Sequence, residues 1–377
     1  MVQKETCNIL ADLISFQTDG TNINQHRACA DYICNILSDN DVFFEKLKSP
    51  QKDIENIFAA INVENLKNIR TGLVLSGHYD VATANENLWK TPPYQAFRRN
   101  QKIYGRGTTD MKYFTAVVLS LLPELKAIGF PIFLLLTGDE ETTVEGIKVL
   151  CNFMCQKQIH PQYALVGEPT NFAVCTSHNG YCGYQTKIYG VAAHSSRPEL
   201  GVNAVFAAAR LANQLEKLGL KYMSEGTTIN VGLIRGGTQR NSVPDQAVTD
   251  WEIRFSKQKH YKEILKKLQK FEEQLLHQYP KACINTSVQE MLPAFEPVEG
   301  KLCAQALGLS GSSIIKMPLA TEAGFLQQYG METIVCGAGD DKLAHTSSEH
   351  ISTDDIARYK NFLLKLIIEL KNQGDRQ

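Results

Sequence analysis

Strand-like and helix-like runs alternate along about the first 170 residues of this chain, and this alternation restricts the folds open to it. Helices are expected over Lys4–Phe16, Gln25–Ser38, a long run from near Asp110, and Val144–Cys155. Strands are expected in "NIFAAINV", "TGLVLSG", Ile132–Leu136 and "YALVG". Strands that alternate with helices favour a mixed, mostly parallel sheet covered by helices. The sequence therefore predicts an α/β fold, in which ligands bind beyond the carboxyl ends of the strands.

The segment from Ser177 to about residue 289 has a different pattern. Its expected strands are "YCGYQTKIYGVAAHS", "TTINVGLIRGG" and "AVTDWEIRF", and its expected helices are Val202–Leu218 and Tyr261–His277. After "EMLPAFEP" the first pattern returns, with a strand in "GMETIVCGAG" and a closing helix over Asp354–Lys371. We therefore predict a discontinuous first domain, residues 1–176 and 290–377, and an inserted smaller α+β domain, residues 177–289.

Length and composition limit the class of protein. At 377 residues the chain is too long for one ordinary core. A formal net charge of −1 argues against nucleic acid or an anionic membrane as the main partner. No apolar run reaches membrane-spanning length, and "MVQKETCNILADLISF" lacks the apolar core of a secretory signal. Ten cysteines in such a chain indicate free thiols, so we expect a cytoplasmic protein.

Three acidic residues directly follow the expected strand Ile132–Leu136, in "TGDEETTVEG". Asp139, Glu140 and Glu141 would raise one another's pKa unless a positive group lay between them. One interpretation is a solvated turn before a helix, because acidic residues are favoured at helix N-termini. The other interpretation is a cation site, and the residues that follow the remaining strands decide between the two.

Metal-binding residue types follow each expected strand of the first domain. His78 and Asp80 come after "TGLVLSG", Glu168 after "YALVG", and His345 after "TIVCGAG", while Asp110 begins a long helix. Because these positions gather at one edge of a sheet, we expect the side chains to converge. Imidazole and carboxylate suit Zn²⁺, Co²⁺ or Mn²⁺, and a bridging carboxylate can hold two ions roughly 3.5–4 Å apart. Asp80 is placed to accept the second N–H of the His78 ring and orient it.

The ordered blocks that carry these residues resemble the signature blocks of the zinc-dependent aminoacylase and carboxypeptidase-like metallohydrolases. The blocks are "SGHYDV", "YGRGTTDMK", "TGDEET", "LVGEPT", "AAHSSRPELGVNAV" and "GAGDDKLAHTSSE", between about residues 70 and 350. Within this family, "GEPT" and "TEA" are most similar to the acetylornithine deacetylases. The resemblance implies a two-metal catalytic domain with an inserted lid and dimerisation domain.

Carried over position by position, the resemblance assigns the metal ligands. They would be His78, Asp110, Glu141, Glu168 and His345, with Asp110 shared by the two ions. His78 and Glu168 would complete one site, and Glu141 and His345 the other.

The resemblance also assigns residues that act on the substrate. Glu140 would be the general base on the attacking water, with Asp80 as the residue that orients His78. His194 of the insert would reach the active site of a partner subunit and stabilise the oxyanion. The substrate-binding residues would be Asn241, Arg254 and Thr321, with Asn241 and Arg254 on the substrate's carboxylate. Arginine suits a bidentate carboxylate clamp.

Two positions depart from the family pattern. Glycine usually follows "DMK", where this chain has Tyr113 and Phe114, and "GPG" before the last ligand is "GAG", Gly337 to Gly339. We expect the first departure to alter helix packing beneath Asp110 and the second to loosen the loop that carries His345.

We therefore expect a cytoplasmic, homodimeric hydrolase with two divalent ions, Zn²⁺ before Co²⁺. The implied reaction removes an acyl group, acetyl first, from the α-nitrogen of an amino acid, with N-acetylornithine (arginine biosynthesis) as first candidate. Acetylcitrulline deacetylation, diaminopimelate desuccinylation and dipeptide cleavage remain open. A catalytically silent binding relative would be expected to have lost a ligand or the base, and all are present. A serine hydrolase using Ser195 or Ser196 beside His194 lacks a G-x-S-x-G elbow.

Overall fold

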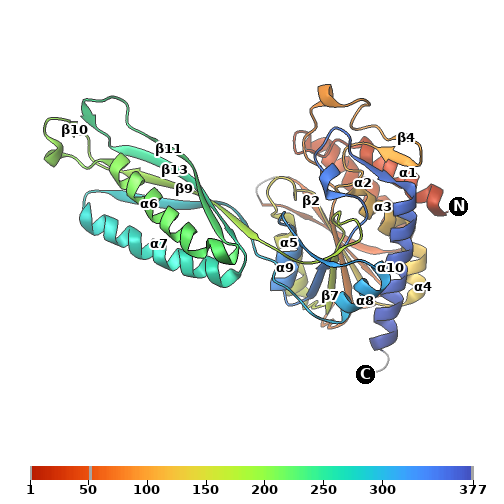
Figure 1. The fold of residues 1–377 in the computed structure, drawn as a ribbon. Helices are drawn as coiled ribbons and strands as arrows, with labels where there is room; N and C mark the ends of the chain where they lie inside the picture. Colours follow the sequence, from red (N-terminus) through yellow and green to blue (C-terminus); the bar gives the residue numbers. More distant parts are fainter. Residues whose placement is uncertain (1, 51–52, 375–377) are drawn as a thin grey trace. The chain divides into compact units, whose positions relative to one another are not determined.

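The computed structural model describes residues 2–50 and 53–374, and the chain divides into two compact units (Figure 1). Unit 1 comprises Met1–Thr176, Pro297–Lys316 and Thr321–Gln377, and unit 2 comprises Ser177–Glu296 and Met317–Ala320. The insert was expected to end at residue 289. Unit 2 continues to Glu296 because a strand that the sequence analysis missed, β14 (Cys283–Leu292), pairs along β9 (Gly180–Tyr189).

Unit 1 is built on a mixed sheet with the strand order β1-β2-β6-β3-β7-β16-β8-β15. Its strands are β1 (Phe43–Lys48), β2 (Glu55–Ile61), β3 (Leu73–His78), β6 (Ile132–Thr137), β7 (Tyr163–Val166), β8 (Val174–His178), β15 (Ile314–Met317) and β16 (Glu332–Val335). The central strands β6, β3, β7 and β16 are parallel. Strands β1 and β2 pair antiparallel with their neighbours, and β8 pairs antiparallel with β16. The predicted α/β class is confirmed.

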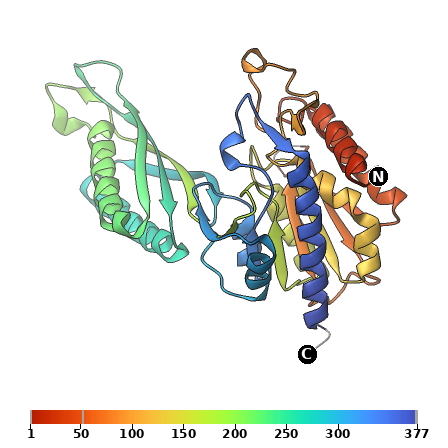
Figure 2. The same cartoon turned by 45° about the vertical axis from the view of Figure 1, so that its right-hand side comes forward.

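Helices cover both faces of this sheet (Figures 1 and 2). They are α1 (Val2–Ser15), α2 (Ile23–Asp39), α3 (Lys112–Ser120), α4 (Leu122–Ile128), α5 (Gly146–Lys157), α8 (Lys301–Ser310), α9 (Ala323–Gln328) and α10 (Thr353–Gly374). Helices α5 and α9 pack together on one face, and α1, α3 and α10 pack together on the other. The long helix expected from Asp110 is divided in two, because Pro123 in the first turn of α4 has no N–H to donate.

The core of unit 1 lies around β3, β6 and α3, in which every residue is buried. Continuous burial is typical of a central parallel strand, which is covered by helices on both faces. A smaller sheet beside the core joins β4 (Phe97–Arg99), β5 (Lys102–Tyr104) and β17 (His350–Ser352). Among the described residues, no helix has both the length and the apolar character needed to cross a membrane.

Unit 2 is an antiparallel sheet with the order β11-β13-β9-β14, and its other two strands are β11 (Thr228–Gly236) and β13 (Gln246–Phe255). Two long helices, α6 (Ala204–Tyr222) and α7 (Gln258–Gln278), cover it, and Leu211, Leu268 and Trp251 share their apolar core. A short pair, β10 (Ala193–His194) with β12 (Ser242–Val243), stands at one end. Both helices and three of these long strands lie where the sequence predicts them.

The ring of Phe114 in α3 packs directly against two glycines that precede expected site residues. A Cβ on Gly77 would lie 2.6 Å from Cδ1 of Phe114, and a Cβ on Gly167 would overlap the same ring. Phe114 is fully buried, so it has little freedom to move aside.

We therefore expect Gly167→Ala to lower the free energy of unfolding by roughly 1–3 kcal/mol, because the added methyl overpacks the core. Gly308→Ala is the matched control, because Gly308 lies inside α8 and a Cβ added to it would meet no atom within 4 Å beyond its own stretch of helix. Alanine at this position should raise the free energy of unfolding by about 0.5–1 kcal/mol. Urea denaturation of both variants measures the difference. Equal stability of the two variants would contradict the packing described here.

Candidate metal centre

The expected metal-binding side chains converge at the carboxyl ends of the parallel strands of unit 1. His78 is the last residue of β3, Glu140 and Glu141 follow β6, and Glu168 follows β7. Because β3 is parallel to both β6 and β7, these ends lie next to one another. Potential ligand atoms of His78, Asp110 and Glu141 lie within 4.8 Å of one another, as do those of His78, Glu140 and Glu168.

The carboxylate of Asp110 lies between two imidazoles. Its Oδ1 is 3.0 Å from Nε2 of His78, and its Oδ2 is 3.2 Å from Nε2 of His345. Glu168 lies on the His78 side, 3.5 Å from Nε2, and Glu141 lies on the His345 side, 3.0 Å from Nε2. The structure thus brings together all five residues expected to be ligands, in two groups that share Asp110.

Negative charge is concentrated in this cluster. Burial raises the pKa of Glu140 well above its usual value and that of Glu168 to about 7. Hydrogen bonds to Asp110 and Glu141 raise the pKa of His345 to about 10. At Asp110, burial would raise the pKa, but hydrogen bonds from the two histidines hold it below its usual value.

These residues fit a pair of divalent cations. Imidazole nitrogen and carboxylate oxygen are the donors that zinc and cobalt accept, and the two oxygens of one carboxylate face different histidines. Bound cations would also offset the repulsion between the acidic groups, which two imidazoles alone leave largely uncompensated.

The expected contact between Asp80 and the second ring nitrogen of His78 is present, and its shorter part is made by the backbone of Asp80. Nδ1 of His78 is 3.0 Å from the backbone carbonyl oxygen of Asp80 and 3.4 Å from its Oδ1. The two carboxylate oxygens instead accept hydrogen bonds from the backbone N–H groups of Glu140, at 3.3 Å, and Glu141, at 3.0 Å. Asp80 therefore orients the ring mainly through its backbone, and its side chain holds the turn that carries both glutamates.

The other acidic residue after β6, Asp139, faces away from the cluster. It is fully buried, and its carboxylate accepts hydrogen bonds from the hydroxyls of Ser49 and Thr143, both at 2.7 Å, and from the N–H of Gly146 at 2.9 Å. Asp139 thus supports the start of α5. The helix-start interpretation of these acidic residues holds for Asp139, in a buried form, and not for Glu140 and Glu141.

Glu322 is a buried carboxylate near the cluster that the sequence analysis did not select. It accepts hydrogen bonds from the hydroxyls of Ser76, at 3.1 Å, and Thr137, at 2.6 Å, which lie near the ends of β3 and β6. Burial raises its pKa to about 7. The only sequence signal was an acidic residue directly after Thr321, in "TEA". Thr321 itself is buried, and its hydroxyl oxygen accepts the N–H of Ala323 at 3.2 Å.

The two departures from the family pattern meet beneath the cluster. Tyr113 is fully buried and donates a hydrogen bond of 2.7 Å to the carbonyl oxygen of Gly167, next to Glu168. Burial raises the pKa of the Tyr113 hydroxyl well above its usual value, and a hydrogen bond from the backbone of Ala338 partly offsets this rise. Proline at position 338 would have no N–H to donate. The two departures therefore belong to one packing arrangement.

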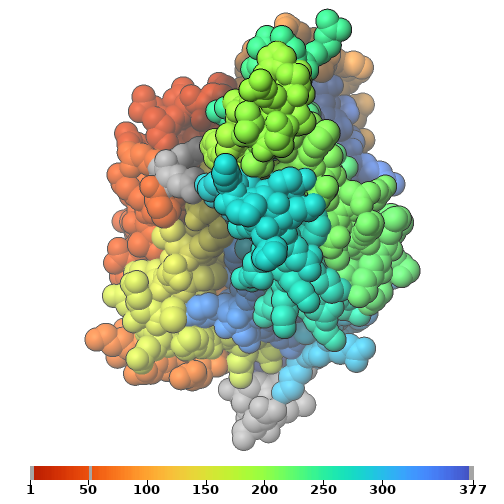
Figure 3. Space-filling model, turned by 90° about the vertical axis from the view of Figure 1, so that its left-hand side faces the viewer, coloured from red at the N-terminus to blue at the C-terminus, as the bar shows by residue number. Residues whose placement is uncertain are grey.

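The expected site residues of unit 2 lie at its two ends. His194 pairs with Ser242 across β10 and β12, and the N–H of Ser195 donates to the carbonyl oxygen of Asn241 at 3.1 Å. Figure 3 views unit 2 from this end, where the yellow-green segment around β10 lies at the surface. His194 is exposed, and its Nδ1 accepts the N–H of Ser196 at 3.2 Å. In the neutral ring the proton is therefore on Nε2, which can donate outward.

Arg254 lies near the other end of β13, roughly 26 Å along the strand from Gln246. Its Nε donates to Glu252 at 3.0 Å, and its guanidinium lies 5.0 Å from the ring centroid of Tyr181. One copy of unit 2 therefore cannot bring Asn241 and Arg254 to the same carboxylate, and their expected joint role would require groups from two copies.

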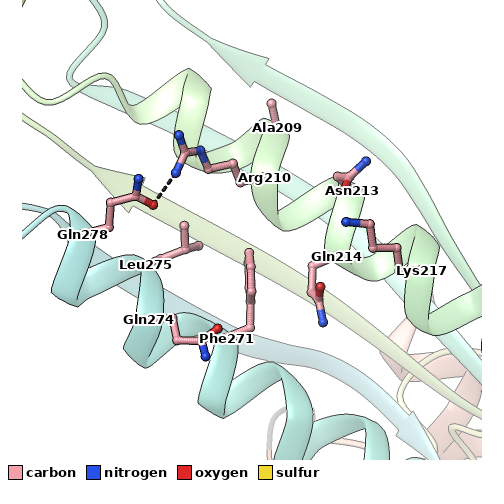
Figure 4. A pocket seen from close by; sticks show the side chains of 9 residues that line it. All are labelled: Ala209, Arg210, Asn213, Gln214, Lys217, Phe271, Gln274, Leu275 and Gln278. Carbon is pink, nitrogen blue, oxygen red and sulfur yellow. Dashed lines mark hydrogen bonds between the residues drawn. The ribbon is translucent and has the colours of Figure 1, made fainter.

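A groove of about 430 Å³ between α6 and α7 is the hollow shown in Figure 4. Arg210, Lys217 and amide side chains line its sides, and Phe271 and Leu275 lie at its base. Arg210 is hydrogen-bonded to Gln278. None of the described residues that line it is acidic or a histidine, so this groove offers none of the donors found at the metal centre.

Comparisons with known proteins agree with this geometry. The chain matches the peptidase family M20/M25/M40 over residues 74–369. It is 28% identical over 353 residues to an acetylornithine deacetylase of Buchnera aphidicola subsp. Acyrthosiphon pisum, and 89% of each chain is covered.

Two solved structures share the fold. Aminopeptidase PepT from Bacillus cereus has a TM-score of 0.77 and 19% identity, covering 98% of this chain and 99% of that one. The YXEP protein of Bacillus subtilis, described as a dinuclear metal binding peptidase of the M20 family, has a TM-score of 0.66 and 12% identity, covering 97% of this chain and 98% of that one.

Glu322 should make the stability of the metal-free protein depend on pH. Its pKa rises from 4.5 to about 7 on folding, so the folded state retains a proton that the unfolded state loses. As pH rises from about 4.5 through 7, this group should therefore lower the free energy of unfolding by up to roughly 3 kcal/mol. The measurement is urea denaturation of wild type and Glu322→Gln at pH 4.5 and 8, in chelator. From pH 4.5 to pH 8, the free energy of unfolding of wild type should fall relative to that of Glu322→Gln, because glutamine does not titrate. A difference independent of pH would contradict the assignment.

Proposed function

This chain belongs to the M20/M25/M40 family of metallohydrolases, and from this we propose that it is a two-metal amidohydrolase acting on N-acyl amino acids. The observation that carries the proposal is the shared carboxylate of Asp110, whose two oxygens face different histidines. The preferred substrate is N-acetylornithine, which the name of the Buchnera relative supports. Eight of the ten cysteines are buried and none forms a disulfide, which supports the cytoplasm as its place of action.

Two sets of residues would hold the ions. His78, Asp110 and Glu168 would hold one, and Asp110, Glu141 and His345 the other. Bound Zn²⁺, or Co²⁺ as second choice, would polarise the scissile carbonyl and lower the pKa of a water.

Glu140 would act as the general base of the reaction. Its carboxylate lies within the cluster but takes no part in the contacts between Asp110 and the two histidines. The backbone N–H of Glu140 donates to the Asp80 side chain, which holds the residue in place. Burial raises its pKa, which suits a group that must take a proton from water and return it to the leaving amine. Asp80 would serve by holding both Glu140 and the ring of His78 in place.

Unit 2 would supply groups that contact the substrate. His194 would donate its Nε2 proton to the oxyanion, a contact worth a few kcal/mol, and the neighbouring Asn241 would bind the same end of the substrate. Arg254 lies at the opposite end of β13. It would therefore bind a substrate carboxylate in a different active site from the one to which the same copy contributes His194. Thr321 would line the pocket from unit 1.

This division suits a homodimer, in which one copy lends His194 and Asn241 to the other. The edge strand β11 supports such pairing, because it exposes Leu233 and Ile234, at 47% and 45% of their surface. An apolar edge strand is a ready template for pairing with a second copy across a two-fold axis.

The test of the function is a product-release assay with added Zn²⁺ or Co²⁺. The panel comprises N-acetylornithine, N-acetylcitrulline, N-succinyl-diaminopimelate, a dipeptide and a tripeptide. We expect the highest kcat/KM for N-acetylornithine, loss of activity after chelator dialysis and its return with metal. Preference for the peptides would replace the deacylase proposal by a peptidase, and full turnover by metal-free protein would overturn the metal proposal.

The two adjacent glutamates should separate in mutation. Glu140→Gln should keep both metals and lose roughly 10²–10⁴-fold in kcat, because it removes the general base. Glu141→Gln should instead lower metal occupancy, because it removes a ligand beside His345. Elemental analysis and steady-state kinetics on the same samples distinguish the roles, and the reverse pattern would exchange them.

Mixed dimers test whether the site is shared between two copies. His194→Ala and Glu140→Gln should each be nearly inactive alone, because each lacks a group that every active site needs. After subunit exchange, half of the dimers are mixed and one of their two sites is complete, so about a quarter of wild-type activity should return. No recovery, with exchange demonstrated by mass spectrometry, would place His194 in its own copy's site or outside catalysis.

A further inference from the structure

The loop that carries Asp110 closes around one buried carboxylate. This loop, residues 105–111 between β5 and α3, has no regular secondary structure, and Gly105 and Gly107 have φ values of 153° and 87°. The backbone N–H groups of Gly107, Thr109 and Asp110 all donate to Oε1 of Glu349, at 3.0, 2.9 and 3.2 Å. Three N–H groups around one point form an anion-binding nest, and here a side chain of the same protein fills it.

The second oxygen of this carboxylate is also occupied. Oε2 of Glu349 accepts a hydrogen bond of 2.7 Å from Nη1 of Arg106, and neither residue has more than 3% of its side chain exposed. A buried carboxylate with four donors is held in one orientation, because any other would leave buried N–H groups without an acceptor. The backbone of Asp110 is therefore fixed through its own N–H and that of its neighbour.

Glu349 follows His345 by four residues, so it joins the two loops that meet at the metal centre. The same two loops are joined again by the hydroxyl of Thr109, which donates to the carbonyl oxygen of His350 at 2.7 Å. The N–H of Gly105 also donates to the carbonyl oxygen of Glu349, at 3.2 Å. Glu349 itself lies outside both groups of expected ligands.

We propose that Glu349 is a positioning residue that holds the shared ligand Asp110 and, through its loop, His345 in the geometry needed to bind both ions. This inference rests on the proposed two-metal function. Because Asp110 is common to both sites, displacement of its loop weakens both ions together. Loss of a ligand that serves one site, such as Glu168, weakens one ion.

Glu349→Gln is the direct test. Glutamine has one acceptor oxygen and one NH₂ group, so either the nest or Arg106 then faces a donor instead of an acceptor. The control is Glu332→Gln. Glu332 likewise accepts a backbone N–H, that of Cys303 at 3.0 Å, but it lies at the amino end of β16, away from the strand ends that form the centre.

The measurement is titration of chelator-treated protein with Co²⁺, followed by calorimetry and by cobalt absorption. Wild type and Glu332→Gln should each bind two Co²⁺, and the affinity of each binding event should be the same in the two proteins. Glu349→Gln should weaken both binding events by roughly 10–100-fold, the usual effect of removing a group that orients metal ligands. Glu168→Gln should weaken chiefly one event. Thermal melts of the metal-free proteins separate this effect from loss of folding.

A lower melting temperature for Glu349→Gln with unchanged Co²⁺ affinities would overturn the proposal, because it would make the role purely structural. Weakening of one event only would overturn it as well. If Glu349→Gln does not fold, Arg106→Gln carries the test: it leaves the nest intact and should weaken both events several-fold, and unchanged affinities would overturn the proposal. Failure of wild type to bind Co²⁺ would refute the two-metal function itself and, with it, the role of Glu349. The wild-type titration alone separates this outcome from a failure of the Glu349 proposal.

Discussion

Mutual repulsion among closely spaced carboxylates is the constraint on which the candidate metal centre of unit 1 depends. Asp110, Glu141 and Glu168 lie within contact distance of only two imidazoles, and one of those, His345, is more than half exposed. Such a cluster persists only where the backbone gives its members no alternative direction. The parallel strands supply this rigidity, because β3, β6 and β7 end beside one another and their ends carry the acidic side chains.

A second group of carboxylates surrounds the first and differs from it in having saturated hydrogen bonds. Asp80, Asp139 and Glu349 each accept two or more backbone N–H groups or side-chain donors, and each fixes a turn that carries an expected ligand. The division of labour follows from this difference. Acidic groups that accept several hydrogen bonds from the protein hold the backbone in place, whereas those that face one another are the proposed cation ligands.

The residues after the strands could be predicted from the sequence because a buried parallel strand has a recognisable apolar run, and its carboxyl end is fixed by that run. The expected site residues His78, Glu140, Glu141 and Glu168 were selected in this way. Strands such as β1 and β14 were missed because most of their residues are partly or fully exposed and show no apolar run. Glu349 and Glu322 lie inside the quoted blocks "GAGDDKLAHTSSE" and "TEA", but neither was selected. Their partners are more than 180 residues away or lie in the backbone, so no local pattern distinguishes these two residues from other acidic residues. The separation of Asn241 from Arg254 needed the register of β13, which composition does not contain.

The contact of Phe114 with Gly77 and Gly167 has a consequence for how a chain of this kind can change over time. While the aromatic ring is in place, neither glycine can acquire a side chain without displacing a fully buried group. The glycines, in contrast, place no limit on a smaller residue at position 114. Replacement of Gly167 therefore requires that the ring at position 114 shrink first. At Gly77 the side chain of Met111, whose Cε would lie 2.7 Å from an added Cβ, would have to move as well. A lineage that gained the ring after those glycines were already present would find that step easy to take and hard to reverse once neighbouring side chains had grown around it.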